Sequence, residues 1–329
     1  MKKRLDLKAY QQGILSGNRA ILSQAITLVE STLESDQELA SDLVQSLISK
    51  TGQSIRIGIT GVPGVGKSTF IEAFGKMLLD RGKKVAVLAI DPSSQLTRGS
   101  ILGDKTRMEN LASDKRAFIR PSPSGTTLGG VSGKTREAML LCEAAGFDVI
   151  LVETVGVGQS ETAVKNMVDF FLLLMLAGAG DELQGIKKGI MEMADALVIH
   201  KADGSNLELA QKAKSSYQNA LHLGQESEKS WNPKVLLASS TTGLGLEYVW
   251  ELIREYEEKM KGNGFWETNR AQQRLSWLDD QIHELLGQAF FKNSQVSELL
   301  TKEKPQVRSG ELNPGTLAKT LIQLFLSKN

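Results

Sequence analysis

The chain has 329 residues, of which 41% are hydrophobic, and its 39 basic and 38 acidic residues give a formal net charge of +1. This length favours one large domain with additions or two domains, and the balanced charge argues against bulk attraction to nucleic acid or acidic membranes. The single cysteine excludes an internal disulfide, and three scattered histidines argue against a zinc or nickel site built by the protein. Polar residues follow the basic N-terminus where a signal peptide would be apolar, so we expect a cytoplasmic protein without a membrane partner.

Residues 1–50 show helical spacing, with Leu39, Leu43 and Leu47 at every fourth position, which predicts an N-terminal helical extension. Between residues 51 and 260, short apolar runs alternate with helical stretches, as expected of strands covered by helices on both faces. The predicted strands are Ile55 to Thr60, Val85 to Asp91, Ala117 to Arg120, Val149 to Thr154, Phe171 to Leu176, Leu197 to His200 and Val235 to Ser239. The predicted fold class is therefore α/β, with a mostly parallel central sheet flanked by helices.

The alternation stops after about residue 261, and an amphipathic pattern follows through Trp277, Ile282, Leu285 and Leu286. Another helix is predicted after residues 313–315. Residues 261–329 are therefore predicted to form a C-terminal helical arm, which packs on the main domain or on a second copy.

A phosphate-binding loop is predicted at Gly61-Val62-Pro63-Gly64-Val65-Gly66-Lys67-Ser68, which matches G-x-x-x-x-G-K-[ST] and is followed by Thr69. The loop lies between a predicted strand and a predicted helix, which is the context that the motif requires. Its glycines let backbone N–H groups turn towards a phosphate, the helix N-terminus adds a positive dipole, and Lys67 reaches the β and γ oxygens. The pattern therefore predicts a P-loop nucleotide site in which Ser68 supplies a hydroxyl ligand to Mg²⁺.

Three acidic residues are candidates for holding Mg²⁺, directly or through water: Asp91 after the second strand, Asp104 in the loop beyond it, and Glu153 at the end of the fourth. Asp91 is also placed to cap a helix or a turn, and Asp104 could be an ordinary loop acid. Glu153 begins the sequence Glu-Thr-Val-Gly, where the backbone N–H of Gly156 can bond a γ-phosphate. Such a loop is expected to order with a triphosphate and to relax after hydrolysis.

The base is expected to lie against His200-Lys201-Ala202-Asp203, which follows a buried strand. The Asp203 carboxylate can accept both N1–H and the 2-amino group of guanine, and the aliphatic stem of Lys201 can cover the base. His200 stands where an asparagine is usual, and its ring N–H could donate to guanine. A strand followed by an ordinary charged turn is the alternative. The backbone after the next strand is expected to close over the base at Ser239, Ser240 and Thr241.

Seven stretches carry a resemblance to a known family: residues 61–69, 89–94, 99–108, 120–123, 128–131, 153–161 and 178–189. Together they resemble the MeaB/ArgK family of GTPases, which includes the methylmalonic aciduria type A proteins and is associated with cobalamin-dependent acyl-CoA mutases. The resemblance covers nearly the whole chain.

This resemblance implies a homodimeric metallochaperone that binds GTP and hydrolyses it to GDP, slowly when alone and faster with a partner. The implied partner is a cobalamin-dependent mutase, by default methylmalonyl-CoA mutase, to which the protein gates delivery of adenosylcobalamin or from which it removes damaged cofactor. The resemblance places the phosphates and Mg²⁺ at Lys67, Ser68, Asp91, Asp104 and Glu153.

The resemblance also implies that residues 178–189 form a switch that communicates with the partner, with Gln184, Lys187 and Lys188 as candidate contacts. Either lysine could offer positive charge to the transition state, and solvent-exposed lysines without that role are the alternative.

Three other functions stay open. A transport-associated kinase or ATPase would prefer ATP and phosphorylate a protein acceptor. A GTPase that delivers nickel or zinc would need Cys and His ligands that this sequence lacks. A signalling or assembly module would show negligible turnover and no stimulation by a partner.

Overall fold

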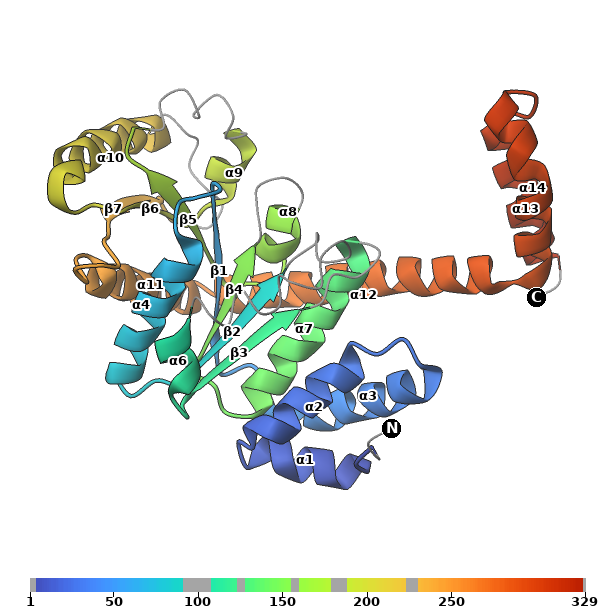
Figure 1. The fold of residues 1–329 in the computed structure, drawn as a ribbon, viewed down its shortest axis with the longest axis horizontal. Coiled ribbons are helices and arrows are strands. Elements are labelled where there is room, and N and C mark those ends of the chain that lie inside the picture. Colours follow the sequence, from blue (N-terminus) through green and yellow to red (C-terminus); the bar gives the residue numbers. More distant parts are fainter. Residues whose placement is uncertain are drawn as a thin grey trace. The chain divides into compact units, whose positions relative to one another are not determined.

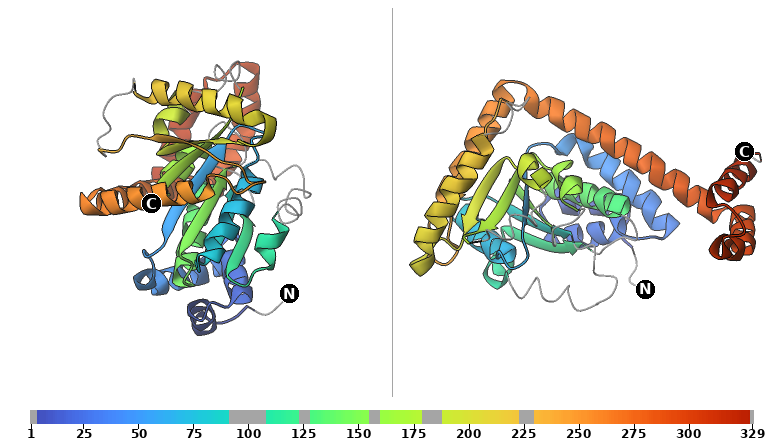
Figure 2. Two further views of the ribbon diagram at one scale, coloured as in Figure 1. Left: turned by 90° about the vertical axis from the view of Figure 1, so that its left-hand side faces the viewer. Right: turned by 90° about the horizontal axis from the view of Figure 1, so that it is seen from above.

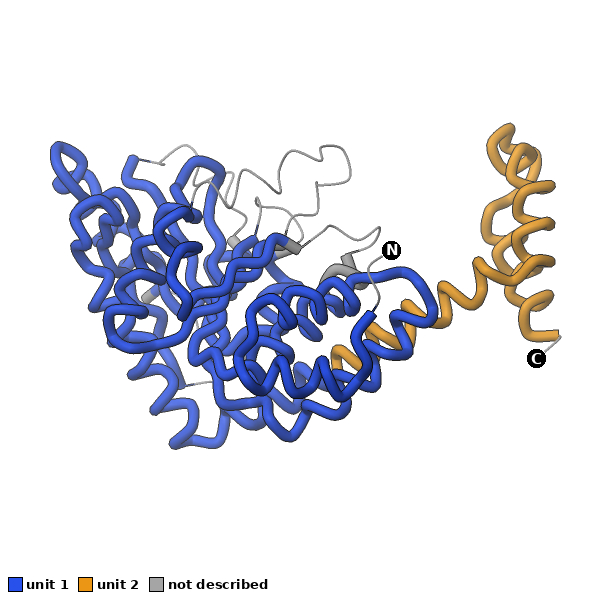
Figure 3. The backbone as a smooth tube through the Cα atoms, turned by 60° about the horizontal axis from the view of Figure 1, so that its bottom comes forward, with its two compact units in different colours: residues 1–274 blue, residues 275–329 orange. Residues whose placement is uncertain are grey.

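The computed structural model describes residues 4–90, 108–122, 128–154, 160–178, 188–222 and 230–327. The chain divides into two compact units, residues 1–274 and residues 275–329 (Figure 3). The functional boundaries expected near residues 50 and 260 remain a prediction.

The first unit contains a seven-stranded sheet of order β3-β2-β4-β1-β5-β6-β7, in which every neighbouring pair is parallel (Figure 1). The strands are β1 (Ile55–Gly61), β2 (Val85–Ile90), β3 (Ala117–Ser122), β4 (Val149–Thr154), β5 (Phe170–Leu176), β6 (Ala196–His200) and β7 (Lys234–Leu237). All seven predicted strands are confirmed, although Ala238 and Ser239 lie beyond the end of β7 and Asp91 lies outside the described residues. Because β1 lies between β4 and β5, the loop that follows β1 leaves the middle of the sheet.

Helices cover both faces of this sheet (Figures 1 and 2). Along β2, Val85 and Val87 enter the core shared with α4 (Lys67–Asp80) and α11 (Leu246–Gly262). Ala86 and Leu88 enter the core on the other face, which is shared with α1 (Leu7–Leu15), α2 (Arg19–Val29), α3 (Glu34–Leu47) and α7 (Leu128–Ala144). This division follows from the alternation of side chains along a strand. The helices of the unit are α1 (Leu7–Leu15), α2 (Arg19–Val29), α3 (Glu34–Leu47), α4 (Lys67–Asp80), α6 (Glu109–Ser113), α7 (Leu128–Ala144), α8 (Ser160–Lys165), α9 (Lys188–Met193), α10 (Leu207–His222), α11 (Leu246–Gly262) and the start of α12 (Phe265–Lys292).

The second unit consists of the rest of α12, α13 (Ser294–Ser309) and α14 (Pro314–Leu326). Asn313 caps α14, because its side chain accepts hydrogen bonds from the backbone N–H groups of Gly315 and Thr316, and Pro314 follows at the first helical position. The unit has a small core of Val296, Leu317 and Leu321. The predicted C-terminal helices are thus confirmed. Within the described ranges, none of the helices has the length and apolar character needed to cross a membrane.

Candidate nucleotide-binding site

The segment from Gly61 to Ser68 connects the central strand β1 to α4, which is the strand–loop–helix arrangement predicted for a P-loop. Gly64 and Gly66 have φ angles of 77° and 92°, in the left-handed region that glycine adopts without a Cβ clash. Gly66 is the N-cap of α4, and Lys67 is the first residue of that helix. The loop therefore brings a helix N-terminus, with its unpaired N–H groups, to the carboxyl edge of the sheet.

The Lys67 ammonium folds back over the loop and donates a hydrogen bond to the Gly61 carbonyl at 2.9 Å. Partial burial lowers the pKa of Lys67, and the negative charges of Glu153 and Glu161 oppose this effect. Glu161 belongs to a stretch that carries the family resemblance, but no motif in the sequence indicates that it lies near this lysine. The ammonium is thus held inside the loop with two carboxylates in its surroundings.

Ser68 and Glu153 are in direct contact, because the Ser68 hydroxyl donates to Glu153 Oε1 at 3.1 Å. Glu153 is buried and lies opposite Ile59 in the pairing of β1 with β4, which brings its carboxylate to the start of α4. A hydroxyl and a carboxylate are hard oxygen donors of the kind that Mg²⁺ binds.

The Ser68 hydroxyl and the Glu153 carboxylate fit a Mg²⁺ ion that is held partly by the nucleotide better than they fit a metal ion held by the protein alone. The parts of the chain that the structure describes contain no cluster of three or more His, Cys, Asp or Glu side chains able to hold a metal ion. Mg²⁺ in nucleotide sites uses one or two carboxylates, with substrate phosphates and water completing its shell. Ser68 and Glu153 would therefore supply part of the protein's share of such a site, and Asp91 and Asp104 remain further predicted ligands.

Several predicted site residues lie outside the described residues: Asp91, Asp104, Gly156, Gln184 and Lys187. Lys188 begins α9, but its side chain is likewise outside the description. The roles assigned to these residues from the sequence remain predictions.

On the other side of the P-loop, Lys201 extends from the end of β6 to the loop, where its ammonium donates to the Gly64 carbonyl at 2.9 Å. Lys201 has a left-handed φ of 58°, which is uncommon for a residue with a side chain. Asn206 donates from Nδ2 to the Lys201 carbonyl at 2.7 Å and so stabilises this conformation. No motif in the sequence indicates this role of Asn206.

The segments after β6 and β7 are joined through Asp203 and Ser239. The Ser239 hydroxyl donates to the Asp203 carboxylate and also accepts from the Thr242 N–H at 3.2 Å. The Ala202 N–H donates to the Ala238 carbonyl at 3.1 Å, so the two segments are linked by backbone as well. The structure therefore places the proposed base-reading carboxylate beside the segment expected to close over the base.

His200 is 2% exposed, and both of its ring nitrogens have partners within the protein. Nδ1 lies 2.7 Å from the Val65 carbonyl oxygen, and Nε2 lies 2.7 Å from the Ser240 hydroxyl. A hydrogen bond from the imidazole to guanine would require one of these contacts to be given up. In this structure both nitrogens are used by the protein itself, and the base contact expected for His200 remains a prediction.

Comparisons with known proteins place the chain among GTPases. A family described as "Methylmalonyl Co-A mutase-associated GTPase MeaB" matches residues 22–295. A putative GTPase of Caulobacter vibrioides is 51% identical over 98% of this chain and 98% of its own length. GTPase ArgK of Escherichia coli is 47% identical over 94% of this chain and 93% of its own.

A mitochondrial methylmalonic aciduria type A homolog of Mus musculus is 44% identical over 96% of this chain and 79% of its own. A solved structure described as the LAO/AO transport system kinase has a TM-score of 0.77 and 38% identity, covering 98% of this chain and all of that one. The family match spans most of the chain, and relatives well above 30% identity cover nearly all of it. This chain belongs to the MeaB family of methylmalonyl-CoA mutase-associated GTPases.

Proposed function

We propose that the chain is a Mg²⁺-dependent GTP hydrolase that serves as a metallochaperone for a cobalamin-dependent acyl-CoA mutase, with methylmalonyl-CoA mutase as the first candidate. GTP binding and hydrolysis would be coupled to the delivery or protection of adenosylcobalamin. The observation that carries the proposal is the family match over residues 22–295, whose description names both the GTPase and the mutase. The P-loop contacts and the Asp203–Ser239 pair support its nucleotide half.

In this proposal the phosphates lie on the loop that ends at Lys67 and Ser68. Lys67 exchanges its hydrogen bond to Gly61 for the β and γ oxygens of the nucleotide. Bound Mg²⁺, held by Ser68 and Glu153, would neutralise charge that builds up on the phosphates. The protein's own contribution is to position the nucleotide and to balance its charge, which accounts for nearly all catalysis of phosphoryl transfer.

Water is positioned by Asp91 or Asp104 in this proposal, and the backbone of Gly156 reports the loss of the γ-phosphate. Because positioning and charge neutralisation provide nearly all of such catalysis, turnover is expected to be slow until a partner completes the site. The mutase would accelerate it by acting on residues 178–189, in which Gln184, Lys187 and Lys188 are the candidate contacts.

We also propose that the second unit forms a homodimer with a second copy of the chain. On α12, Leu275, Leu278, Ile282 and Leu285 are all at least 45% exposed and recur at helical spacing. A groove of about 720 Å³ in the same unit is lined almost entirely by apolar side chains, including Leu286, Phe291 and Ile322. Such a surface is larger than scattered exposed residues and is typical of an interface.

The first experiment is to measure hydrolysis of GTP, with ATP as a control, in the absence and presence of a purified cobalamin-dependent methylmalonyl-CoA mutase. The proposal predicts slow GTP turnover that the mutase stimulates, little ATP turnover, and loss of activity in Lys67→Ala. No stimulation of GTP turnover would contradict the mutase role while leaving the nucleotide site in place. Preference for ATP with phosphorylation of a protein acceptor would favour a transport-associated kinase, which is how the relative of known structure is described.

A further inference from the structure

His200 is the point at which three parts of the nucleotide site meet. Its Nδ1 contacts the Val65 carbonyl in the P-loop, and its Nε2 contacts the Ser240 hydroxyl after β7, each at 2.7 Å. The ring also packs at right angles to Phe70 of α4, with ring centroids 5.7 Å apart and an interplanar angle of 89°. The imidazole is therefore held from the phosphate side, the base side and the helix that follows the P-loop.

The P-loop also fits closely against this ring. A Cβ built on Gly66 would lie 3.1 Å from Cε1 and 3.2 Å from Nδ1 of His200, which is tighter than ordinary van der Waals contact. The loop therefore approaches the imidazole at Gly66 as well as at Val65. A change in the position of the ring would therefore shift the P-loop backbone at Val65 and Gly66, which is expected to surround the phosphates.

The chemistry of the two contacts fixes the tautomer of the ring. A carbonyl oxygen can only accept, so Nδ1 carries the hydrogen that is donated to Val65. In the neutral ring Nε2 is then an acceptor, and the Ser240 hydroxyl donates to it. One residue thus provides a donor to the phosphate side and an acceptor to the base side.

We propose that His200 is a positioning residue that couples the phosphate-binding loop to the base-side segment at Ser240 without contacting the guanine base. This inference rests on the proposed guanine-nucleotide function. A nucleotide bridges the same two parts, since its phosphates lie on the P-loop and its base lies beside Asp203. His200 holds the P-loop and the segment at Ser240 at the spacing that the nucleotide requires. The entropic cost of ordering these two segments on nucleotide binding is therefore smaller.

A residue that holds the two parts of the site together affects nucleotide affinity but not the selectivity for the base. Loss of the hydrogen bonds of His200 should weaken the binding of GDP and of GTP by similar factors. Both nucleotides depend on the same spacing between the P-loop and the base-side segment. It should leave the preference for guanine over hypoxanthine and adenine unchanged, because Asp203 is untouched. A residue that read the base would instead change that preference.

The experiment is to measure equilibrium binding of GDP, GTP, IDP and ADP to the full chain and to His200→Ala, with thermal unfolding to check that the variant is folded. We expect GDP and GTP to bind on the order of tenfold more weakly, as for the loss of two buried hydrogen bonds, with an unchanged ratio of GDP to IDP affinity. Unchanged affinity, or a changed ratio between the bases, would overturn the inference. Failure of the wild-type chain to bind guanine nucleotides would instead overturn the proposed function.

Two conservative variants separate the two contacts. The amide nitrogen of Asn is separated from Cα by the same number of bonds as Nδ1 of His, and that of Gln by the same number as Nε2. His200→Asn can therefore retain the hydrogen bond to Val65, whereas His200→Gln can reach Ser240. Each should recover part of the affinity lost in His200→Ala, and no recovery in either would contradict the bridging role.

Ser240→Ala tests the same bridge from its other end and keeps the inference testable if His200→Ala does not fold. We expect it to weaken GDP binding a few-fold, and the double variant His200→Ala/Ser240→Ala to be no weaker than His200→Ala. Fully additive losses would show that the two side chains act independently and would overturn the coupling. His283→Ala is the matched control, because His283 is exposed and its ring nitrogen is hydrogen-bonded within its own helix, at the Asp279 carbonyl.

Discussion

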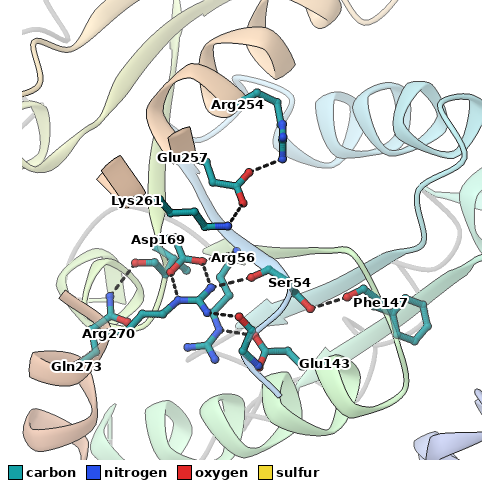
Figure 4. A network of polar contacts seen from close by, with 12 residues as sticks. Ser54, Arg56, Glu143, Phe147, Asp169, Arg254, Glu257, Lys261, Arg270 and Gln273 are labelled. Atoms are coloured by element: carbon teal, nitrogen blue, oxygen red, sulfur yellow. Dashed lines mark hydrogen bonds and ion pairs between the residues drawn. The ribbon is translucent and has the colours of Figure 1, made fainter. Parts of the chain in front are cut away.

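Arg270 and Asp169 form a doubly hydrogen-bonded ion pair in the interior of the first unit, with Nε to Oδ1 and Nη2 to Oδ2 both at 2.7 Å (Figure 4). Both residues are buried. The guanidinium also donates to the carbonyls of Gly52 and Ser54 at 2.7 Å, and Asp169 accepts from the Arg56 N–H at 2.8 Å. The first turns of α12 are thereby attached to the residues that precede β1 and β5.

This ion pair predicts a large loss of stability in Arg270→Ala. The substitution would leave the Asp169 charge buried without its partner, which costs about 3–5 kcal/mol in measured cases. Urea unfolding of the full chain, followed by fluorescence, measures the change in the free energy of unfolding. Arg274→Ala is the matched control, because Arg274 lies one turn further along α12 and is exposed, and it should change stability by less than about 0.5 kcal/mol. Equal effects of the two substitutions would contradict the role of the pair.

The strands could be predicted from the sequence because their signal is local. In Val149–Thr154 and Phe170–Leu176 the apolar runs are almost uninterrupted, as strands covered on both faces require. The P-loop was equally local, since its defining residues are contiguous. Arg270 and Asp169 are 101 positions apart, and no periodicity indicates that an arginine in an amphipathic helix turns inward to an aspartate before a strand.

The sequence predicts individual residues of the candidate site, but it does not predict the contacts between them. The motif identified His200 as a residue of the base side, yet its contact with Val65 joins positions 135 apart. The same holds for the influence of Glu161 on Lys67, which depends on how α8 packs. Motifs locate groups that touch a ligand, whereas contacts among those groups follow from the packing of the sheet and its helices.

The contact between Ser68 and Glu153 predicts that both contribute to Mg²⁺-dependent binding. Ser68→Ala removes the hydroxyl, and Glu153→Gln removes the charge while keeping the shape. Titration of GTP with excess Mg²⁺ and with EDTA should show a Mg²⁺ effect in the wild-type chain that each variant reduces, on the order of tenfold. Glu251→Gln, on the exposed face of α11, should behave as the wild type. A full Mg²⁺ effect in both variants would exclude these residues from the metal site.

Asp203 is predicted to determine base selectivity. An ionised carboxylate accepts from both N1–H and the 2-amino group of guanine, whereas the amide in Asp203→Asn offers a single acceptor oxygen. We expect this variant to bind GDP roughly 10- to 100-fold more weakly, as for loss of a hydrogen bond to a charged group. Its preference for GDP over IDP, which lacks the 2-amino group, should shrink as well. Asp42→Asn, at an exposed position of α3, is the control, and a variant at Asp203 with unchanged preference would contradict the assignment.

His200 also predicts a dependence of stability on pH. Burial lowers the pKa of His200, the hydrogen bond to Val65 and the charge of Asp203 oppose this, and the charge of Lys201 adds to it. As pH falls below about 6.5, the unfolded chain takes up a proton that the folded chain does not yet bind. The contribution of His200 to stability is therefore complete above about pH 6.5 and is lost as pH falls through its folded-state pKa.

The measurement is the free energy of unfolding between about pH 8 and about pH 5 for the wild-type chain and His200→Gln, which cannot titrate in this range. Since the two other histidines are common to both proteins, the difference between the two curves isolates His200. The wild-type curve should fall more steeply on the acid side. Parallel curves would mean that the ring is not held in its neutral form.

We predict that dimerisation depends on exposed apolar side chains of the second unit that are not part of its core. Leu286 and Phe291 are 56% and 64% exposed and line the groove, whereas the core of the unit is formed by Val296, Leu317 and Leu321. Leu286→Asp/Phe291→Asp should therefore leave the unit folded and place two charges in the proposed interface. Burying unpaired carboxylates between two copies is strongly unfavourable, so the dimer should dissociate.

Sedimentation velocity of the wild-type chain and the double variant measures this directly, with circular dichroism to confirm that the helices remain. Gln288→Asp is the control for the kind of charge, because it adds one carboxylate at an exposed position on the same helix that does not line the groove. We expect the control to stay dimeric while the double variant sediments as a monomer. A monomeric wild-type chain at micromolar concentration would rule out the dimer, whereas a dimeric double variant would move the interface away from this groove.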